Sequence, residues 1–501
     1  MFGFFLLTTG YVSANYGRIL GAHIVDPVLT DAGFVSGTVI DAVPYTGIST
    51  LIGEIGKEVR IYRGIPFAAP PVGNLRWKPP QPVPPWEGIR ESTKFSLWAP
   101  QSFPTAAWSG GIPESGMGED CLYLNVLTPA KNDKDRLPVM VWLHGGGLNA
   151  SSGNMGSYNT PPLPQHGVVL VTVSHRLGAI GYLAHPWLDA ESGASGNYGQ
   201  LDIIAALKWV KRNISAFGGN PNNVTIFGQS GGGAKVVWLL ASPLAKGLFQ
   251  RAIIEAGIGA GTGGGSADSY IFQTKELAWT NGEKLSNYLG VSSLAELRSK
   301  SWQDIIKATT SPGSGQPIPS GFETRYTVDG WSLPDTIWNL MAAGKKNDVP
   351  VMIGAGEPEL AKHQGTTVWA PVLLNGRSNL YVYVFSQVPS NWRNFGLKAY
   401  HGLEVAYQFG TIDLIRFHRN ALFAAPPGLP VDPGLDFMDV WVTDVTMKMW
   451  ARFAAIGNPS IKGVVWWPDF DLKPGLDRYL NIAYPLEVKS NFLATYPYPA
   501  P

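Results

Sequence analysis

The chain has 501 residues, of which 45% are hydrophobic and 15% are charged, so it can bury a large core and lacks the composition of a disordered chain. Its 38 basic and 37 acidic residues give a formal net charge of +1, and no basic run is dense enough to neutralise several phosphates. Nucleic acid is therefore excluded as an expected partner.

The N-terminal segment, residues 1–14, holds a short apolar run and ends in Val-Ser-Ala, which suits signal-peptidase cleavage, but it lacks a positively charged start. A secretory signal peptide and an ordinary apolar strand are both open interpretations. With a signal peptide the protein is secreted or periplasmic, and otherwise it is cytoplasmic. Residues 15–501 contain no linker, so we expect one domain there. No apolar stretch reaches the roughly 18 residues that a membrane span needs.

Two features precede the strongest strand signals. Residues 62–100 are rich in proline and tryptophan, and we predict that they wrap the sheet as irregular structure. Cys121 is the only cysteine, which excludes an internal disulfide and a cysteine-based metal cluster, and we predict no metal site. Because no activating neighbour is evident, we interpret Cys121 as a buried structural thiol rather than a nucleophile.

Short apolar or β-branched runs then alternate with amphipathic segments, as is typical of strands that are buried on both faces. Apolar residues at helical spacing predict one helix over residues 200–217, closed by two glycines, and another over 436–456, followed by an extended tail. This β, α, β order predicts an α/β fold with a mostly parallel central sheet and helices on both faces. The predicted strands are residues 139–143, 168–173, 224–227, 252–255, 349–353 and 380–385.

A His-Gly-Gly-Gly sequence, His144 to Gly147, directly follows the strand predicted at 139–143. This pattern is typical of an oxyanion loop, because consecutive glycines let backbone N–H groups turn towards one point, where a tetrahedral intermediate places its negative oxygen. We predict Gly146 and Gly147 as the donors from this loop, although a plain turn is the alternative. A strand, a helix and a further strand separate the loop from the next motif, as an oxyanion loop requires.

Residues 228–232 form the only Gly-x-Ser-x-Gly sequence of the chain. The strand predicted at 224–227 precedes it, and apolar spacing predicts a helix over 233–242 after it. A serine on such a sharp turn exposes its hydroxyl and aims the following amide at the reacting carbonyl. We therefore predict Ser230 as a nucleophile and the N–H of Gly231 as a third oxyanion donor, rather than a glycine-rich connection with an incidental serine.

With these motifs the sequence resembles the type-B carboxylesterases, a family of α/β-hydrolases that includes the cholinesterases. The resemblance runs from about residue 35 to residue 471. It implies an α/β-hydrolase fold, a single domain, hydrolysis of a small-molecule ester, and no metal or organic cofactor. Four further segments carry it: YRGIPFAAPPVG at 62–73, EDCLYLNV at 119–126, GNYGQLD at 196–202 and NISAFGGNPNNVT at 213–225.

A serine nucleophile needs a base, which follows the acid along the chain in this fold. His363, His401 and His418 are the histidines that lie well past the serine. His401 lies in YHGLEVAYQF, which resembles the histidine loop of the family, so we predict it as the base. We interpret His363 and His418 as surface or packing residues.

The orienting acid should follow the strand predicted at 349–353, where Glu357 and Glu359 are available. The family pattern favours Glu359, and Glu357 is the alternative. The resulting mechanism has two stages: an acyl group is transferred to the serine, and water then releases it as the acid. The alternatives are the same machinery acting on amide or carbamate bonds, or an inactive relative that only binds partners.

The chain departs from the family pattern in several places. Gln229 stands before the nucleophile where the family usually has glutamate, and Gly231 replaces the usual alanine. Cys121 has no partner for the disulfide that the family commonly forms. The interval from Glu359 to His401 is short, so either the helical cap over the cleft is trimmed or the acid is misplaced.

Overall fold

The computed structural model describes residues 27–40, 58–102, 115–257, 272–312, 316–363, 365–421 and 426–497. The segment considered as a signal peptide, residues 1–14, lies outside these ranges. Among the helices that the structure describes, none is both long enough and apolar enough to cross a membrane.

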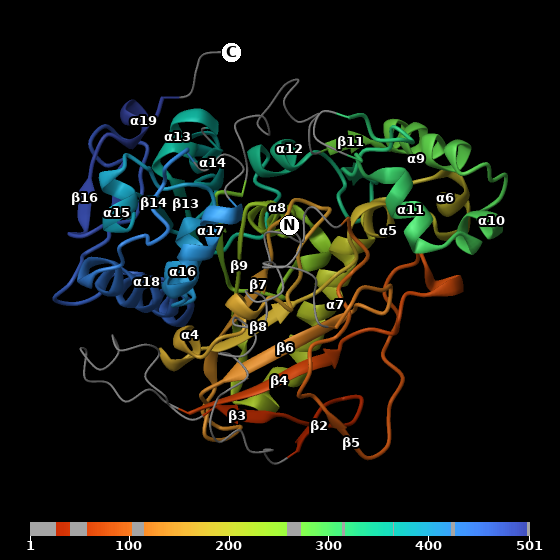
Figure 1. Ribbon diagram of the computed structural model, residues 1–501, viewed down its shortest axis with the longest axis horizontal. Helices are drawn as coiled ribbons and strands as arrows, with labels where there is room; N and C mark the ends of the chain where they lie inside the picture. Colours follow the sequence, from red (N-terminus) through yellow and green to blue (C-terminus); the bar gives the residue numbers. More distant parts are fainter. Residues whose placement is uncertain are drawn as a thin grey trace.

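An eleven-stranded sheet runs through the molecule (Figure 1). In spatial order its strands are β16 (Glu487–Lys489), β15 (Tyr479–Ile482), β14 (Leu380–Phe385), β13 (Val351–Gly356), β10 (Arg251–Glu255), β9 (Gly219–Gln229), β7 (Leu137–Leu143), β8 (Val169–Val173), β6 (Tyr123–Thr128), β4 (Val59–Pro66) and β3 (Thr38–Ile40). From β15 to β8 all neighbours are parallel, and the pairs at both margins are antiparallel. The predicted α/β fold with a mostly parallel sheet is confirmed.

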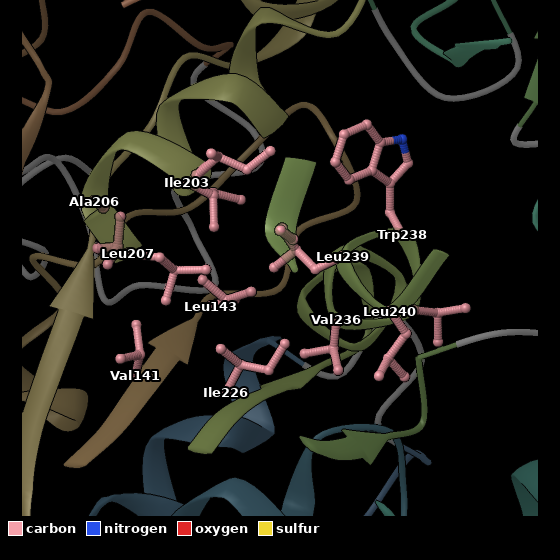
Figure 2. Close-up of a cluster of buried hydrophobic side chains, with 14 of the residues drawn as sticks. Val141, Leu143, Ile203, Ala206, Leu207, Ile226, Val236, Trp238, Leu239 and Leu240 are labelled. Atoms are coloured by element: carbon pink, nitrogen blue, oxygen red, sulfur yellow. The ribbon is translucent and has the colours of Figure 1, made fainter. Parts of the chain in front are cut away.

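Helices cover both faces of the sheet because side chains alternate along each strand. From β7, Val141 and Leu143 point into a cluster with α7 (Tyr198–Asn213) and α8 (Gly231–Ala241), which Figure 2 shows. Trp142, between them, packs on the opposite face with α16 (Leu403–Gln408) and α18 (Phe437–Ile456). In Figure 1, α18 and α7 lie on opposite sides of β7 and β9.

The remaining elements are shorter or lie towards the edges of the sheet. Two small sheets consist of β1 (Val28–Leu29), β2 (Phe34–Ser36) and β5 (Ile89–Glu91), and of β11 (Phe272–Thr274) and β12 (Tyr326–Val328). The other α-helices are α4 (Pro162–Gln165), α5 (Gly178–Tyr182), α6 (Pro186–Ser192), α9 (Lys275–Tyr288), α10 (Leu294–Ser299), α11 (Trp302–Thr309), α12 (Ile337–Ala342), α13 (Glu357–His363), α14 (Gly365–Leu373), α15 (Ser390–Asn394), α17 (Ile415–Ala421) and α19 (Phe492–Thr495).

All six predicted strands are present, but two expectations need correction, and the predicted extended tail takes part in the sheet. The strand predicted at 224–227 begins at Gly219, because Leu137 of β7 pairs with that glycine across the sheet. The region 62–100 is not irregular at its start, where β4 pairs with β6. The extended tail contains β15, which extends the parallel sheet beside β14, and β16. These strands are short and polar in part, so sheet pairing rather than local sequence stabilises them.

Candidate active site

Ser230 lies at the turn between the end of β9 and the start of α8. Its backbone has φ 58° and ψ −126°, a conformation that residues with a side chain seldom adopt. The Ser230 N–H donates to the carbonyl of Glu255 at 2.8 Å. A Cβ on Gly232 would lie 1.9 Å from the carbonyl oxygen of Leu143, so only glycine fits there. The turn is held by its neighbours and leaves the serine partly exposed.

The glycine loop after β7 lies directly against this turn. Gly146 and Gly147 have φ values of +82° and +60°, which favour glycine, and both are exposed. A Cβ on Gly231 would lie 2.3 Å from the carbonyl oxygen of Gly147. Because Gly231 has no Cβ, the loop and the start of α8 approach more closely than an alanine at that position would allow.

His401 and Glu359 come together although they are 42 residues apart in sequence. The Nδ1 atom of His401 is hydrogen-bonded to Oε1 of Glu359. The Glu359 side chain is 16% exposed and that of His401 is 43% exposed. By contrast, Glu357 faces Lys398, with 3.6 Å between Oε2 and Nζ. The structure thus brings the histidine to Glu359 and leaves Glu357 in a separate surface ion pair.

The other histidines named from the sequence occupy different surroundings. The Nδ1 atom of His418 is hydrogen-bonded to the Tyr400 hydroxyl at 2.8 Å. Burial lowers the pKa of His418 to about 4. The His363 side chain lies outside the described part of the structure. Cys121 is buried, and burial raises the pKa of its thiol well above the usual value. A neutral thiol in such a place is a packing residue.

Within the described residues, no hydrogen bond joins the Ser230 hydroxyl to the ring of His401. The Nε2 atom of Gln229 instead lies 3.4 Å from both ring nitrogens of His401. Equal distances to the two nitrogens place the amide over one face of the ring rather than in line with either nitrogen. A contact at this length is weak.

Two buried carboxyl groups beside these residues were not expected from the sequence. Burial raises the pKa of Glu255 to about 7, although Trp450 Nε1 donates to its Oε1 at 2.8 Å. Burial also raises the pKa of Glu404 well above its usual value, and the charges of Glu359 and Glu255 act in the same direction. Only the apolar residues around Glu404 in its helix could have signalled that it is buried.

The segments that follow β9, β7, β13 and β14 can together support one kind of chemistry. They hold a strained serine, two exposed glycines and a histidine–carboxylate pair. A hydroxyl nucleophile, a base with its orienting acid and backbone donors are the groups that acyl transfer requires.

Comparison with known proteins finds esterases that are similar to this chain over most of its length. A family model described as the carboxylesterase family matches residues 46–367 and 364–497. Carboxylesterase 1C of Mus musculus is 31% identical over 540 residues, which cover 93% of this chain and 90% of that protein. The fumonisin B1 esterase of Sphingopyxis macrogoltabida is 39% identical over 318 residues, covering 62% of this chain and 55% of that protein.

Solved structures show the same likeness. A thermophilic PNB esterase superposes with a TM-score of 0.75 and 26% sequence identity, covering 94% of this chain and 98% of that one. A second PNB esterase structure gives a TM-score of 0.72 at 27% identity.

Proposed function

Because the chain belongs to the carboxylesterase family of ester-hydrolysing enzymes, we propose that it forms an acyl-enzyme on Ser230, with His401 as base and Glu359 as orienting acid. The family and its structural neighbours have the α/β-hydrolase fold, in which a serine at the strand-to-helix turn is the nucleophile. The hydrogen bond between His401 Nδ1 and Glu359 Oε1 is the observation that carries the assignment.

The reaction proceeds through two tetrahedral intermediates. His401 Nε2 takes the hydroxyl proton as the Ser230 oxygen bonds to the acyl carbon, and the same proton passes to the departing alcohol. Water then attacks the acyl-enzyme, its proton goes to His401, and the acid leaves as the serine oxygen regains a proton. The Glu359 carboxylate holds the ring so that Nδ1 carries a proton and Nε2 is free to accept one.

The negative oxygen of each intermediate is held by backbone N–H groups of Gly146, Gly147 and Gly231. The exposure of the two loop glycines and the close approach of Gly147 to Gly231 at the start of α8 support this assignment. Removal of one such donor typically costs about 3 kcal/mol of transition-state stabilisation, so three donors contribute a large part of the rate.

The contact between Gln229 and His401 does not conflict with this mechanism. The amide of Gln229 makes only weak 3.4 Å contacts with the ring, so Gln229 does not oppose a movement of His401 towards Ser230.

The substrate is a small carboxylic ester, and amides or carbamates are the other bonds that the same groups could cleave. Fumonisin B1 belongs in a substrate panel because the relative that hydrolyses it is 39% identical over the region it shares with this chain.

Covalent labelling tests the nucleophile. A fluorophosphonate should bond to Ser230 and abolish hydrolysis of p-nitrophenyl esters, because such reagents need a serine activated by a base and an oxyanion site. Peptide mass spectrometry locates the adduct, and Ser230→Ala should be neither labelled nor active. Adduct formation at another residue, or full activity of Ser230→Ala, would reject the assignment.

A further inference from the structure

The loop that carries Gly146 and Gly147 is held from behind through its carbonyl groups. The carbonyl of Gly145 accepts from Nδ1 of His144 at 2.9 Å, which fixes the proton of that ring on Nδ1. The carbonyl of Gly146 accepts from the N–H groups of Asn149 and Ala150 at 3.2 and 3.0 Å. In a trans peptide the carbonyl and the following N–H point in opposite directions. The N–H groups that follow these two carbonyls therefore point away from their anchors.

Lys235 anchors the two outer carbonyls of the same loop. Its Nζ donates to the carbonyl of His144 and to the carbonyl of Gly147, at 2.9 Å in each case. Lys235 belongs to α8, which begins at Gly231 immediately after the nucleophile. The two bonds thus tie the glycine loop to the helix that extends from Ser230.

A lysine in this position is costly for the fold. Its side chain is completely buried, and no carboxylate among the described residues forms an ion pair with it. Burial lowers its pKa from 10.5 to about 7. An apolar residue of similar length would pack there without this desolvation penalty, so the lysine is expected to contribute something other than stability.

The loop itself explains what that contribution is. Three consecutive glycines have more conformational freedom than any other sequence of that length, and the carbonyl of Gly147 would have no other anchor among the hydrogen bonds that the described residues make. Freed at that end, the loop could rotate its peptide planes, and the N–H groups would no longer converge on one point. Preorganised donors are effective because they need no reorientation during the reaction.

We propose that Lys235 is a positioning residue for the oxyanion site: through the carbonyls of His144 and Gly147, its Nζ fixes the glycine loop against α8. The inference rests on the proposed function, because it assumes that the oxyanion of a Ser230 adduct lies at this loop. Lys235 does not touch the substrate and acts only through the backbone that it holds.

Lys235→Met tests this role, because methionine keeps an unbranched apolar chain and removes the donors. We expect kcat for p-nitrophenyl esters to fall roughly 10- to 100-fold, with KM unchanged to within about threefold. Rates are expressed per site titrated with a fluorophosphonate, so that unfolded protein is not counted. Affinity for a trifluoromethyl ketone, whose adduct with serine carries an oxyanion, should fall by the same factor as kcat/KM.

The control is Val236→Ala, on the next residue of α8, which packs into the apolar cluster of Figure 2. It should lower Tm but leave kcat and ketone affinity unchanged, because it makes no bond to the loop. If Lys235→Met does not accumulate as folded protein, Lys235→Gln, which keeps one amide donor, should show a smaller parallel loss in kcat/KM and ketone affinity.

Wild-type kcat in the folded Lys235→Met or Lys235→Gln variant would overturn the proposal, and so would a fall in kcat without a matching loss of ketone affinity. Failure of the proposed function is distinguishable from both results. In that case Ser230→Ala would keep its activity, or the ketone would not inhibit the wild-type protein.

Discussion

At the scale of single residues, the position of Glu359 rather than its charge separates it from Glu357. The two carboxylates lie two residues apart at the start of α13, yet one bonds to His401 and the other faces Lys398 at the surface. Successive residues of a helix point about 100° apart around its axis, so a shift of two residues moves a carboxylate to another side. Only one of them can orient the imidazole.

Paired substitutions test which carboxylate acts. Glu359→Gln should lower kcat/KM by roughly two orders of magnitude or more, because a neutral amide neither stabilises the imidazolium nor enforces the required tautomer. Glu357→Gln removes the same charge from the same helix and is the matched control, expected within a few-fold of wild type. Steady-state kinetics with one p-nitrophenyl ester measures both, and the reverse ranking would move the acid to Glu357.

At the scale of elements, β10 and α18 share a buried carboxyl group. Glu255 at the end of β10 accepts a hydrogen bond from Trp450 of α18, and its backbone carbonyl holds the N–H of Ser230. Its pKa is raised from 4.5 to about 7 by burial. The folded protein therefore binds a proton there that the unfolded chain has already released, and this favours folding at acid pH.

This linkage predicts how stability changes with pH. The contribution of Glu255 is fully present below pH 4.5 and is lost as the pH rises through about 7, because the folded state must then ionise a buried group. Glu255→Gln keeps an oxygen for Trp450 and cannot ionise. It should therefore raise the free energy of unfolding at pH 8 by up to roughly 2–3 kcal/mol and change it little near pH 5.

Thermal melts at both pH values measure the effect. An increase in Tm that is equal at pH 5 and pH 8 would show that packing, rather than ionisation, distinguishes the variant.

At the scale of the whole molecule, the topology explains how a short interval can still assemble the site. Because β13 and β14 are adjacent parallel strands, the loops that follow them leave the sheet at the same edge. The 42 residues from Glu359 to His401 contain most of α13, then α14, β14 and α15. They therefore comprise the crossover connection between β13 and β14, the strand β14 itself, and one short helix after it. The short interval is therefore compatible with Glu359 as the acid.

The same short interval has a consequence for substrate choice. No long helical insertion lies between Glu359 and His401 in the described residues, and 43% of the His401 side chain is exposed. We expect the cleft to be open, so that it excludes less water and contacts the acyl chain over less area. Each lost methylene contact is worth only about 1–3 kcal/mol, and discrimination between acyl groups should be weak.

We therefore predict that kcat/KM values for p-nitrophenyl esters of small and bulky acids differ by no more than about two orders of magnitude. The measurement is a panel from acetate to long-chain and aromatic esters at substrate concentrations far below KM. Hydrolysis confined to one acyl size would contradict an open cleft.

Much of the fold was predictable because its signals are local. The six central strands are short apolar runs, and the helices beside them carry apolar residues at helical spacing. The local pattern of each segment therefore predicts whether it is a strand or a helix. The edges were not predictable in the same way. Gly219 at the start of β9 and Asn481 in β15 have no strand preference of their own and are extended because neighbouring strands pair with them.

The sequence by itself determined the α/β class through the alternation of its apolar segments, and the serine turn and the glycine loop through motifs of consecutive residues with fixed local geometry. It limited the acid and the base to a few candidates through their order along the chain and the family resemblance. Only the tertiary structure decided what those residues touch. It separated Glu359 from Glu357, set Gln229 over His401, and placed Lys235 behind the glycine loop. These relations join segments far apart in the chain, and they depend on desolvation and hydrogen bonding across packed elements, which no local pattern records.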